Sequence, residues 1–252
     1  MILKPISLNI HEYPEPLHYY LKGAKLYDSS CSANAKVIFI DKDGGYFLKV
    51  GAVADLDGEY EMTRYFNGKG LAADVVEYLF DDRHDYLLTQ KVAGDDCTAA
   101  KYLEQPERLS DTLAELLSVL HSYDHSGCPV PNHTERFLLR AEHNYIIGRC
   151  DGALFSNNWG YTTPDEAYEL IKLKGHLLQT DTLLHGDYCL PNIILDNWGF
   201  SGFVDLDSGG VGDSHVDLFW GAWTLSFNLK TDKYRQRFYD AYGRDKIDEE
   251  RL

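Results

Sequence analysis

The chain has 252 residues, which is enough for one large domain or two lobes with a substantial core. Its 24 Lys and Arg residues against 40 Asp and Glu residues give a formal net charge of -16, so we do not expect nucleic acid or an acidic membrane as a partner. Met1 to His11 does not resemble a signal peptide, and no run of about 18 apolar residues is present. The five cysteines are scattered and include no C-x-x-C pair, so they predict neither a disulfide framework nor a zinc site. We therefore expect a cytoplasmic protein.

Short β-like runs dominate the first 90 residues. Residues 37–40 and 46–50 are apolar runs that flank Asp-Lys-Asp-Gly-Gly, which predicts a hairpin. Residues 59–66 carry Met62 and Phe66 at helical spacing, and residues 86–89 again favour a strand.

After Gly94 the pattern becomes mostly helical. One helix is indicated by an apolar stripe with a period of 3.6 residues, formed by Leu109, Leu113, Leu116, Leu117 and Leu120. Thr163-Pro164-Asp165-Glu166 is a capping box with proline at the first helical position, and it predicts a helix to about Leu178. The whole pattern predicts an α+β fold with a small antiparallel sheet lobe (1–90), a hinge (91–94) and a larger, mainly helical lobe (95–252).

The main candidate catalytic and metal-binding residues lie in two short motifs. These are His-Gly-Asp-Tyr-Cys-Leu-Pro-Asn at 185–192 and Gly-Phe-Val-Asp at 202–205. Phosphoryl transfer requires a carboxylate that orients the attacking hydroxyl and oxygen ligands for magnesium. Asp187 suits the first role, and Asn192 and Asp205 suit the second. Residues 192–196 and 202–205 are expected to be strands joined by a turn at 197–199, which would return Asp205 to the neighbourhood of Asn192.

These two motifs, HGDYCLPN and GFVDLD, resemble those of the aminoglycoside 3'-phosphotransferases, which have a protein-kinase-like fold. The wider superfamily includes choline, homoserine and macrolide kinases. The resemblance covers most of the chain. It implies an enzyme that uses ATP and Mg²⁺ to phosphorylate an aminoglycoside hydroxyl, in particular the 3'-hydroxyl, and so confers antibiotic resistance. GTP is left open as an alternative nucleotide.

In a kinase-like fold the small lobe supplies a cation for the nucleotide phosphates, and Lys49 is the candidate. It stands in an apolar strand, where an unpaired ammonium would be expensive to bury. Glu59 and Glu61 are the possible partners. Glu59 shares a helical face with Met62 and Phe66, whereas Glu61 points about 200° away, so we expect Glu59 to pair with Lys49.

Other nucleotide contacts are predicted from the position of the residues and from the resemblance. No G-x-G-x-x-G loop precedes Lys49, and a serine-rich segment that includes Ser30 and Ser32 stands where a phosphate-covering loop should lie. Phe47 resembles the aromatic residue on which adenine stacks in the family, although ordinary core packing is an equal alternative. Gln90, at the end of the small lobe, and Val92, in the expected hinge, are further candidate contacts to the nucleotide.

His185 is expected to brace the catalytic loop by hydrogen bonding, because Asp187 already faces the acceptor hydroxyl. Asp217 resembles a family aspartate that supports this loop from the start of a helix. We expect the role of both residues to be structural.

The substrate is less well defined. A polycationic aminoglycoside would require carboxylates near the acceptor, and the candidate substrate residues are Asp151, Asn157 and Asp232, with Glu249 and Glu250 near the C-terminus. The insert at 151–160 is mostly neutral, Asp207-Ser208 replaces the usual Gly-Arg, and family members are expected to continue about a dozen residues further. The alternatives are a kinase for a macrolide, a peptide antibiotic or a metabolite, and a non-catalytic binding protein. We expect a monomer or weak dimer.

Overall fold

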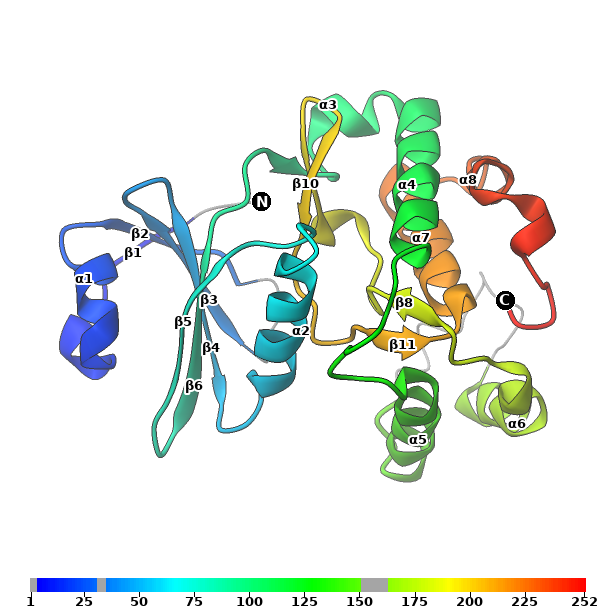
Figure 1. Cartoon of the computed structure of the whole chain (residues 1–252), viewed down its shortest axis with the longest axis horizontal. Coiled ribbons are helices and arrows are strands. Elements are labelled where there is room, and N and C mark those ends of the chain that lie inside the picture. The colour runs from blue at the N-terminus through cyan, green and yellow to red at the C-terminus, as the bar shows by residue number, and fades with distance from the viewer. Residues whose placement is uncertain (1–3, 31–34, 151–162) are drawn as a thin grey trace. The chain divides into compact units, whose positions relative to one another are not determined.

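The structure is a computed structural model that describes residues 4–30, 35–150 and 163–252. The chain forms two compact units. The first comprises Met1–Leu109 and Cys189–Ser208, and the second comprises Ser110–Tyr188 and Gly209–Leu252. Antiparallel sheet in the first unit and helices in the second confirm the predicted α+β class (Figure 1). The lobe boundaries at 90 and 95 and the hinge between them stay predictions.

A six-stranded antiparallel sheet forms the centre of the first unit, in the order β1-β2-β3-β4-β6-β5 (Figure 1). Its strands are β1 (Lys4–Ile6), β2 (Lys25–Asp28), β3 (Lys36–Asp41), β4 (Tyr46–Ala52), β5 (Val75–Phe80) and β6 (His84–Gln90). The hairpin of β3 and β4 and the strand β6 confirm the sequence pattern. The pattern did not indicate β1, β2 or β5, because their residues are mostly half-buried or exposed and do not alternate between apolar and polar.

The two faces of this sheet are covered by different helices, because successive side chains of a strand point to opposite faces. One face packs against the chain at α1 (His18–Leu21), and the buried residues of this core are Leu17, Leu21, Ile38, Ile40, Leu48, Tyr86 and Leu88. The other face carries Lys49 and Leu87, which are paired across β4 and β6. It is covered by α2 (Asp57–Asn67), whose Met62 and Phe66 are fully buried. Figure 1 shows α1 and α2 on opposite sides of the sheet.

A smaller sheet in the first unit has the order β10-β9-β7. Its strands are β7 (Asp95–Asp96), β9 (Ile193–Asp196) and β10 (Gly199–Phe203). The predicted bounds of the last strand were wrong. Asn197 and Trp198 alone make the turn, both with positive φ, so Gly199 already pairs with Asp196. Asp205 lies beyond the strand with a φ of 61°, in the left-handed region.

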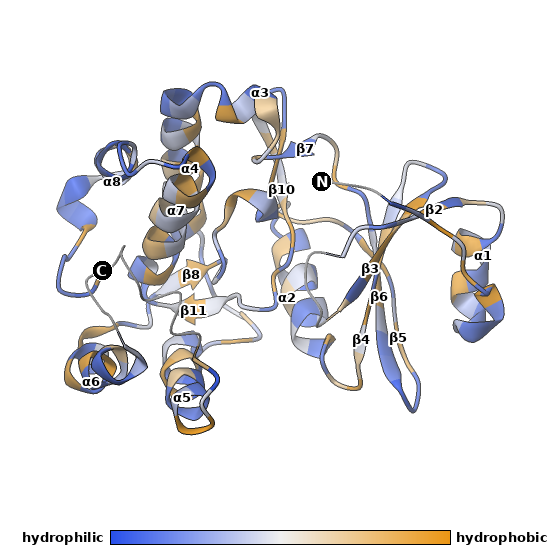
Figure 2. Cartoon of the chain, turned by 180° about the vertical axis from the view of Figure 1, so that it is seen from behind, coloured by the Kyte–Doolittle hydropathy of each residue, from blue (hydrophilic) through white to orange (hydrophobic). Residues whose placement is uncertain are grey.

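The second unit is mainly helical. Its helices are α4 (Pro106–His121), which begins in the first unit, α5 (His133–Ile146), α6 (Pro164–Lys174), α7 (Ser214–Leu229) and α8 (Arg235–Tyr242). The strands β8 (Thr182–Leu184) and β11 (Gly210–Gly212) form an antiparallel pair. Helix α7 is apolar along most of its length (Figure 2).

The predicted capping box at α6 is confirmed, because the Thr163 hydroxyl accepts the Glu166 N–H at 3.2 Å and Pro164 opens the helix. The helix ends at Lys174 and not at Leu178, since Gly175 starts a short 3₁₀ turn and glycine is a poor helix former. Among the described residues, no helix is both long enough and apolar enough to span a membrane.

Candidate functional site

Lys49 lies at the centre of a charged cluster in the first unit. Its Nζ donates to Glu59 Oε2 at 2.6 Å and to Asp205 Oδ1 at 2.7 Å. Strand β4 presents Lys49 on the face covered by α2, and Glu59 lies in the first turn of that helix. The structure therefore brings Lys49 and Glu59 together as the helical phase predicted, and it leaves Glu61 exposed. The contact between Lys49 and Asp205 joins residues 156 positions apart, and the sequence did not predict it.

The electrostatics of the cluster keep Lys49 charged. Burial alone would lower the pKa of Lys49, but the carboxylates of Glu59 and Asp205 outweigh it and raise the pKa above its ordinary value. Burial raises the pKa of Glu59, and the nearby charges of Asp205 and Asp207 add to the rise while Lys49 opposes it. A fixed ammonium at this position can neutralise phosphate oxygens.

Asn192 and Asp205 supply the oxygen donors that the sequence assigns to magnesium. The two residues are tied together by their backbones, because Val204 N–H donates to the Asn192 carbonyl at 3.0 Å. The Asp205 side chain is 49% exposed although Lys49 binds Oδ1, so the carboxylate remains accessible to a ligand. An amide oxygen and a carboxylate are hard ligands of the kind that magnesium prefers, with water and phosphate completing its coordination. The donor set therefore fits Mg²⁺.

Asp187 lies in the second unit, in the loop that follows β8. It is half-buried, and its N–H donates to His185 Nδ1 at 3.3 Å. Gly186 adopts a φ of 82°, a conformation that glycine accepts more readily than other residues. The next residue, Tyr188, is fully buried and donates its hydroxyl to the Leu113 carbonyl at 2.8 Å. These contacts fix the backbone on both sides of Asp187.

Asp217 holds the same loop from the first turn of α7. Its two carboxylate oxygens accept the N–H groups of His185 and Gly186, each at 2.8 Å. His121 Nε2 lies 3.3 Å from Oδ2 of Asp217, and His121 Nδ1 lies 2.8 Å from the Tyr242 hydroxyl. Burial would raise the pKa of Asp217, but His121 and the backbone of His185 lower it below its ordinary value. Asp217 and His185 therefore brace the loop in the manner expected, and His121 is a supporting residue that the sequence did not reveal.

The other predicted nucleotide contacts lie in the first unit. Phe47 is half-buried on the same strand face as Lys49, with its ring 5.1 Å from that of Phe39. Gln90 and Val92 line a cavity of about 230 Å³ together with residues 72–74 and Ser201. Ligand pockets are typically about 300–1,000 Å³, so this cavity alone would hold only part of a nucleotide.

The serine-rich segment is only partly described. The Ser30 hydroxyl accepts the Val37 N–H at 3.0 Å, which joins the end of this segment to β3. Ser32 lies outside the described residues, as do the substrate candidates Asp151 and Asn157. The third substrate candidate, Asp232, lies between α7 and α8 with its side chain 66% exposed and paired with Arg235 at 3.1 Å.

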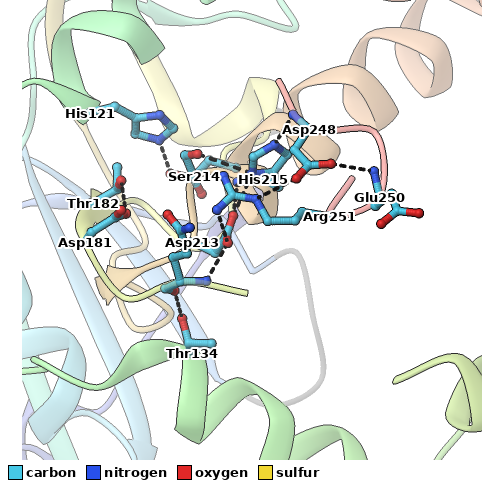
Figure 3. A network of polar contacts seen from close by, with 12 residues as sticks. His121, Thr134, Asp181, Thr182, Asp213, Ser214, His215, Asp248, Glu250 and Arg251 are labelled. Atoms are coloured by element: carbon cyan, nitrogen blue, oxygen red, sulfur yellow. Dashed lines mark hydrogen bonds and ion pairs between the residues drawn. The ribbon is translucent and has the colours of Figure 1, made fainter. Parts of the chain in front are cut away.

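A second buried carboxylate, Asp213, joins the C-terminal segment to the start of α7 (Figure 3). Asp213 Oδ1 lies 2.7 Å from His215 Nδ1, and its Oδ2 lies 3.3 Å from Arg251 Nη1. His215 Nε2 accepts the Asp248 N–H at 2.9 Å. His215 follows Asp213 by only two positions, whereas Arg251 lies far along the chain, and nothing in the sequence indicated that second contact.

Two comparisons identify related sequences. Residues 28–252 match the profile of the phosphotransferase enzyme family, APH. The chain is 53% identical over 250 residues to a probable aminoglycoside 3'-phosphotransferase of Lactococcus lactis subsp. lactis (strain IL1403), covering 99% of this chain and 95% of that protein. It is 29% identical to an aminoglycoside 3'-phosphotransferase of Niallia circulans, covering 82% of this chain and 79% of that protein.

Solved structures share the fold. A crystal structure of aminoglycoside-3'-phosphotransferase of type VIII has a TM-score of 0.72 and 23% identity, and it covers 96% of this chain and 92% of that one. The aminoglycoside phosphotransferase APH(3'')-Id from Streptomyces rimosus, in complex with ADP and streptomycin, has a TM-score of 0.76 and 19% identity over 95% of both chains. At these identities the likeness establishes the kinase-like fold alone.

The family profile covers nearly the whole chain, and the first relative is more than half identical along almost its full length. The cluster of Lys49, Glu59 and Asp205 lies inside the matched residues, as does the loop of Asp187 that Asp217 holds. The chain therefore belongs to the phosphotransferase enzyme family, APH.

Proposed function

We propose that the protein transfers the γ-phosphoryl group of Mg-ATP to the 3'-hydroxyl of an aminoglycoside and so confers resistance to it. The observation that carries the proposal is the Lys49 ammonium held between Glu59 and Asp205. A lysine in this setting is suited to the nucleotide phosphates, and a partner carboxylate on a helix is the arrangement found in protein kinases. The names of the relatives from Lactococcus lactis and Niallia circulans support the choice of acceptor.

In this mechanism Asp187 orients the acceptor hydroxyl and takes its proton as the bond to phosphorus forms. The bond between the γ-phosphorus and its bridging oxygen breaks, and ADP leaves with the electron pair. The proton passes from Asp187 to water. His185 and Asp217 keep the loop of Asp187 in place through the hydrogen bonds described above.

Asn192 and Asp205 would hold magnesium, which supplies positive charge that neutralises the triphosphate. Lys49 binds phosphate oxygens, and Glu59 keeps Lys49 in position. Ser30, Ser32, Phe47, Gln90 and Val92 are proposed to contact the rest of the nucleotide. ATP is the proposed donor, and a comparison of turnover with ATP and GTP tests that choice.

A net charge of -16 favours a polycationic acceptor over an anionic one. Asp151, Asn157 and Asp232 are proposed to contact the acceptor, together with Glu249 and Glu250. We further propose that the protein acts in the cytoplasm as a monomer or weak dimer, without a nucleic-acid partner.

The test is to incubate the protein with Mg-ATP and each of kanamycin, neomycin and an uncharged macrolide, and to look for a phosphorylated product by mass spectrometry. Michaelis constants for the acceptor are then measured between about 0.01 M and 0.15 M salt, where the screening length falls from about 30 Å to about 8 Å. We expect the Michaelis constant for kanamycin to rise steeply with salt and that for Mg-ATP to rise less. Preference for the macrolide, or a Michaelis constant for kanamycin that does not change with salt concentration, would contradict the aminoglycoside proposal.

A further inference from the structure

The N-terminus of α2 takes its cap from the sheet. The first N–H groups of a helix lack partners within the helix, and a polar side chain at the N-cap usually satisfies one of them. In α2 the N-cap residue is Leu56, which has no side chain able to do this. Its own N–H donates instead to Oδ2 of Asp85, a residue of β6, at 3.1 Å. Asp85 is 1% exposed.

Tyr78 of β5 joins the same carboxylate to α2 by a second route. Its hydroxyl donates to Asp85 Oδ2 at 3.1 Å. Its ring stacks on that of Tyr60 in α2, with centroids 4.3 Å apart and an interplanar angle of 13°. Burial and the Asp85 carboxylate raise the pKa of Tyr78 to about 12, so the hydroxyl remains a donor at neutral pH. One buried carboxylate thus accepts from the helix start and from a residue packed on the helix.

Gly51 leaves the space that this arrangement needs. It pairs with Asp85 across β4 and β6, and a Cβ at Gly51 would lie 3.0 Å from Leu56 Cγ and 3.2 Å from Cδ2. The absence of a side chain therefore lets Leu56 approach the strand closely. Lys49 lies two residues before Gly51 on the same strand and face, opposite Leu87.

The chain distance from this anchor to the charged cluster is short. Glu59 follows Leu56 by three residues, which is less than one helical turn. Fixing the position and direction of the helix start therefore fixes where the Glu59 carboxylate points. In this position Glu59 Oε2 lies 2.6 Å from Lys49 Nζ.

We propose that Asp85 is a positioning residue for nucleotide binding: with Tyr78 and Gly51 it seats the start of α2 so that Glu59 meets Lys49. The inference rests on the proposed function, because it assigns Lys49 to the nucleotide phosphates. Asp85 acts only through Glu59 and does not touch the nucleotide. The alternative is that Asp85 merely stabilises the fold.

Asp81 provides a matched control. It accepts the N–H groups of Arg83 and His84 at 2.8 and 2.9 Å and the Tyr86 hydroxyl at 3.0 Å. It is thus a carboxylate directly after the end of β5, in the turn to β6, that makes the same kinds of hydrogen bond. Those bonds lie within the hairpin of β5 and β6, so Asp81 cannot act on Glu59 in the same way.

The experiment measures the dissociation constant of Mg-ATP by calorimetry for the full chain and for Asp85→Asn, Asp81→Asn, Glu59→Gln and the double variant Asp85→Asn with Glu59→Gln. We expect Asp85→Asn to weaken binding by between about 10-fold and about 100-fold, the range that corresponds to the loss of one hydrogen bond to a charged group. Asp81→Asn should stay within about twofold of the unchanged chain. In the Glu59→Gln background, Asp85→Asn should add less than about threefold, because its route of action is already lost.

A role in folding alone would give a different result. In one case Asp85→Asn would lower the melting temperature but bind Mg-ATP with the same dissociation constant as Asp81→Asn. In the other case Asp85→Asn would weaken Mg-ATP binding by the same factor whether or not Glu59→Gln is also present. Either result overturns the inference. If Asp85→Asn does not fold, Tyr78→Phe keeps the stacked ring and removes one hydrogen bond, and we expect a loss of roughly 2- to 10-fold that also disappears in the Glu59→Gln background. Failure of the unchanged chain to bind Mg-ATP would overturn the proposed function and this inference with it.

Discussion

Replacing Asp217 by asparagine removes the charge that holds the loop of Asp187. In the native protein both carboxylate oxygens are used, one by the His185 N–H and one by the Gly186 N–H, each at 2.8 Å. An asparagine can accept only one of them through its oxygen, and its NH₂ group then faces the other N–H. The variant therefore loses one hydrogen bond to a charged group and leaves a buried donor without a partner.

The magnitude follows from these two losses. A hydrogen bond to a charged group contributes about 1.5–3 kcal/mol, and an unsatisfied buried group costs about 1–3 kcal/mol. Both losses concern the same N–H group, so adding the two ranges in full would count part of the free energy twice. We therefore expect Asp217→Asn to lower the free energy of unfolding by about 2–5 kcal/mol. The control is Asp240→Asn, since Asp240 has a side chain 66% exposed and pairs with Arg244 across one turn. Such surface pairs contribute about 0.3–0.5 kcal/mol.

Urea unfolding measures both variants, and steady-state kinetics shows what happens to the loop. We expect kcat to fall in Asp217→Asn while the affinity for Mg-ATP changes little, because Lys49 and Asp205 keep their contacts. A loss of stability no larger than that of Asp240→Asn, with unchanged kcat, would refute the assigned role of Asp217.

The pH dependence gives an independent check. The pKa of Asp217 is lowered in the folded protein, so its stabilising effect is fully present above the unfolded value near 3.9 and disappears as the pH falls through the lower folded value. The stability difference between the native protein and Asp217→Asn should therefore stay constant from pH 7 down to about 4.5 and shrink only below about 4. A difference that already shrinks above pH 5 would contradict the lowered pKa.

Three further variants test the site. Asp187→Asn should reduce turnover by about 10²- to 10⁴-fold while nucleotide binding stays near normal, and more than about a tenth of native turnover would exclude Asp187 as the residue that takes the proton. Asp205→Ala should weaken Mg-nucleotide binding more than Asn192→Ala, since it removes a charge as well as a ligand, and a titration that gives equal losses would reject the ligand assignment. Glu59→Gln and Lys49→Ala should be non-additive in a double-mutant cycle on Mg-ATP affinity, with a coupling of about 0.5–3 kcal/mol, and simple additivity would argue against the pair.

Local signals in the sequence predicted two of the contacts that the structure shows. The Thr163 cap depends on residues three positions apart, and the pairing of Glu59 with Lys49 depends on helical phase within one short helix. Both could be predicted because the geometry of a single element determines them. Asp85, a charged residue directly before the apolar residues Tyr86, Leu87 and Leu88 of β6, is a comparable local signal.

Contacts between distant segments could not be predicted in the same way. Lys49 meets Asp205 only because the hairpin of β9 and β10 returns to the first unit, and Asp217 meets His185 across 32 positions. The turn at Asn197 and Trp198 was misjudged because Gly199 looks like a turn residue, whereas two non-glycine residues with positive φ make the turn. The contact between Asp213 and Arg251 likewise forms only because the last residues of the chain fold back to the start of α7.

The central claim is that a single hydroxyl of a polycationic acceptor receives the phosphoryl group. The most direct test compares an aminoglycoside that carries the 3'-hydroxyl with its 3'-deoxy analogue, which has the same amino groups and lacks only that oxygen. Both are incubated with the protein and Mg-ATP, and the products are examined by mass spectrometry and by ³¹P and ¹H NMR. The account predicts one added phosphoryl group at the 3'-oxygen of the first compound and none on the second. Equal phosphorylation of both compounds, or of neither, would contradict it.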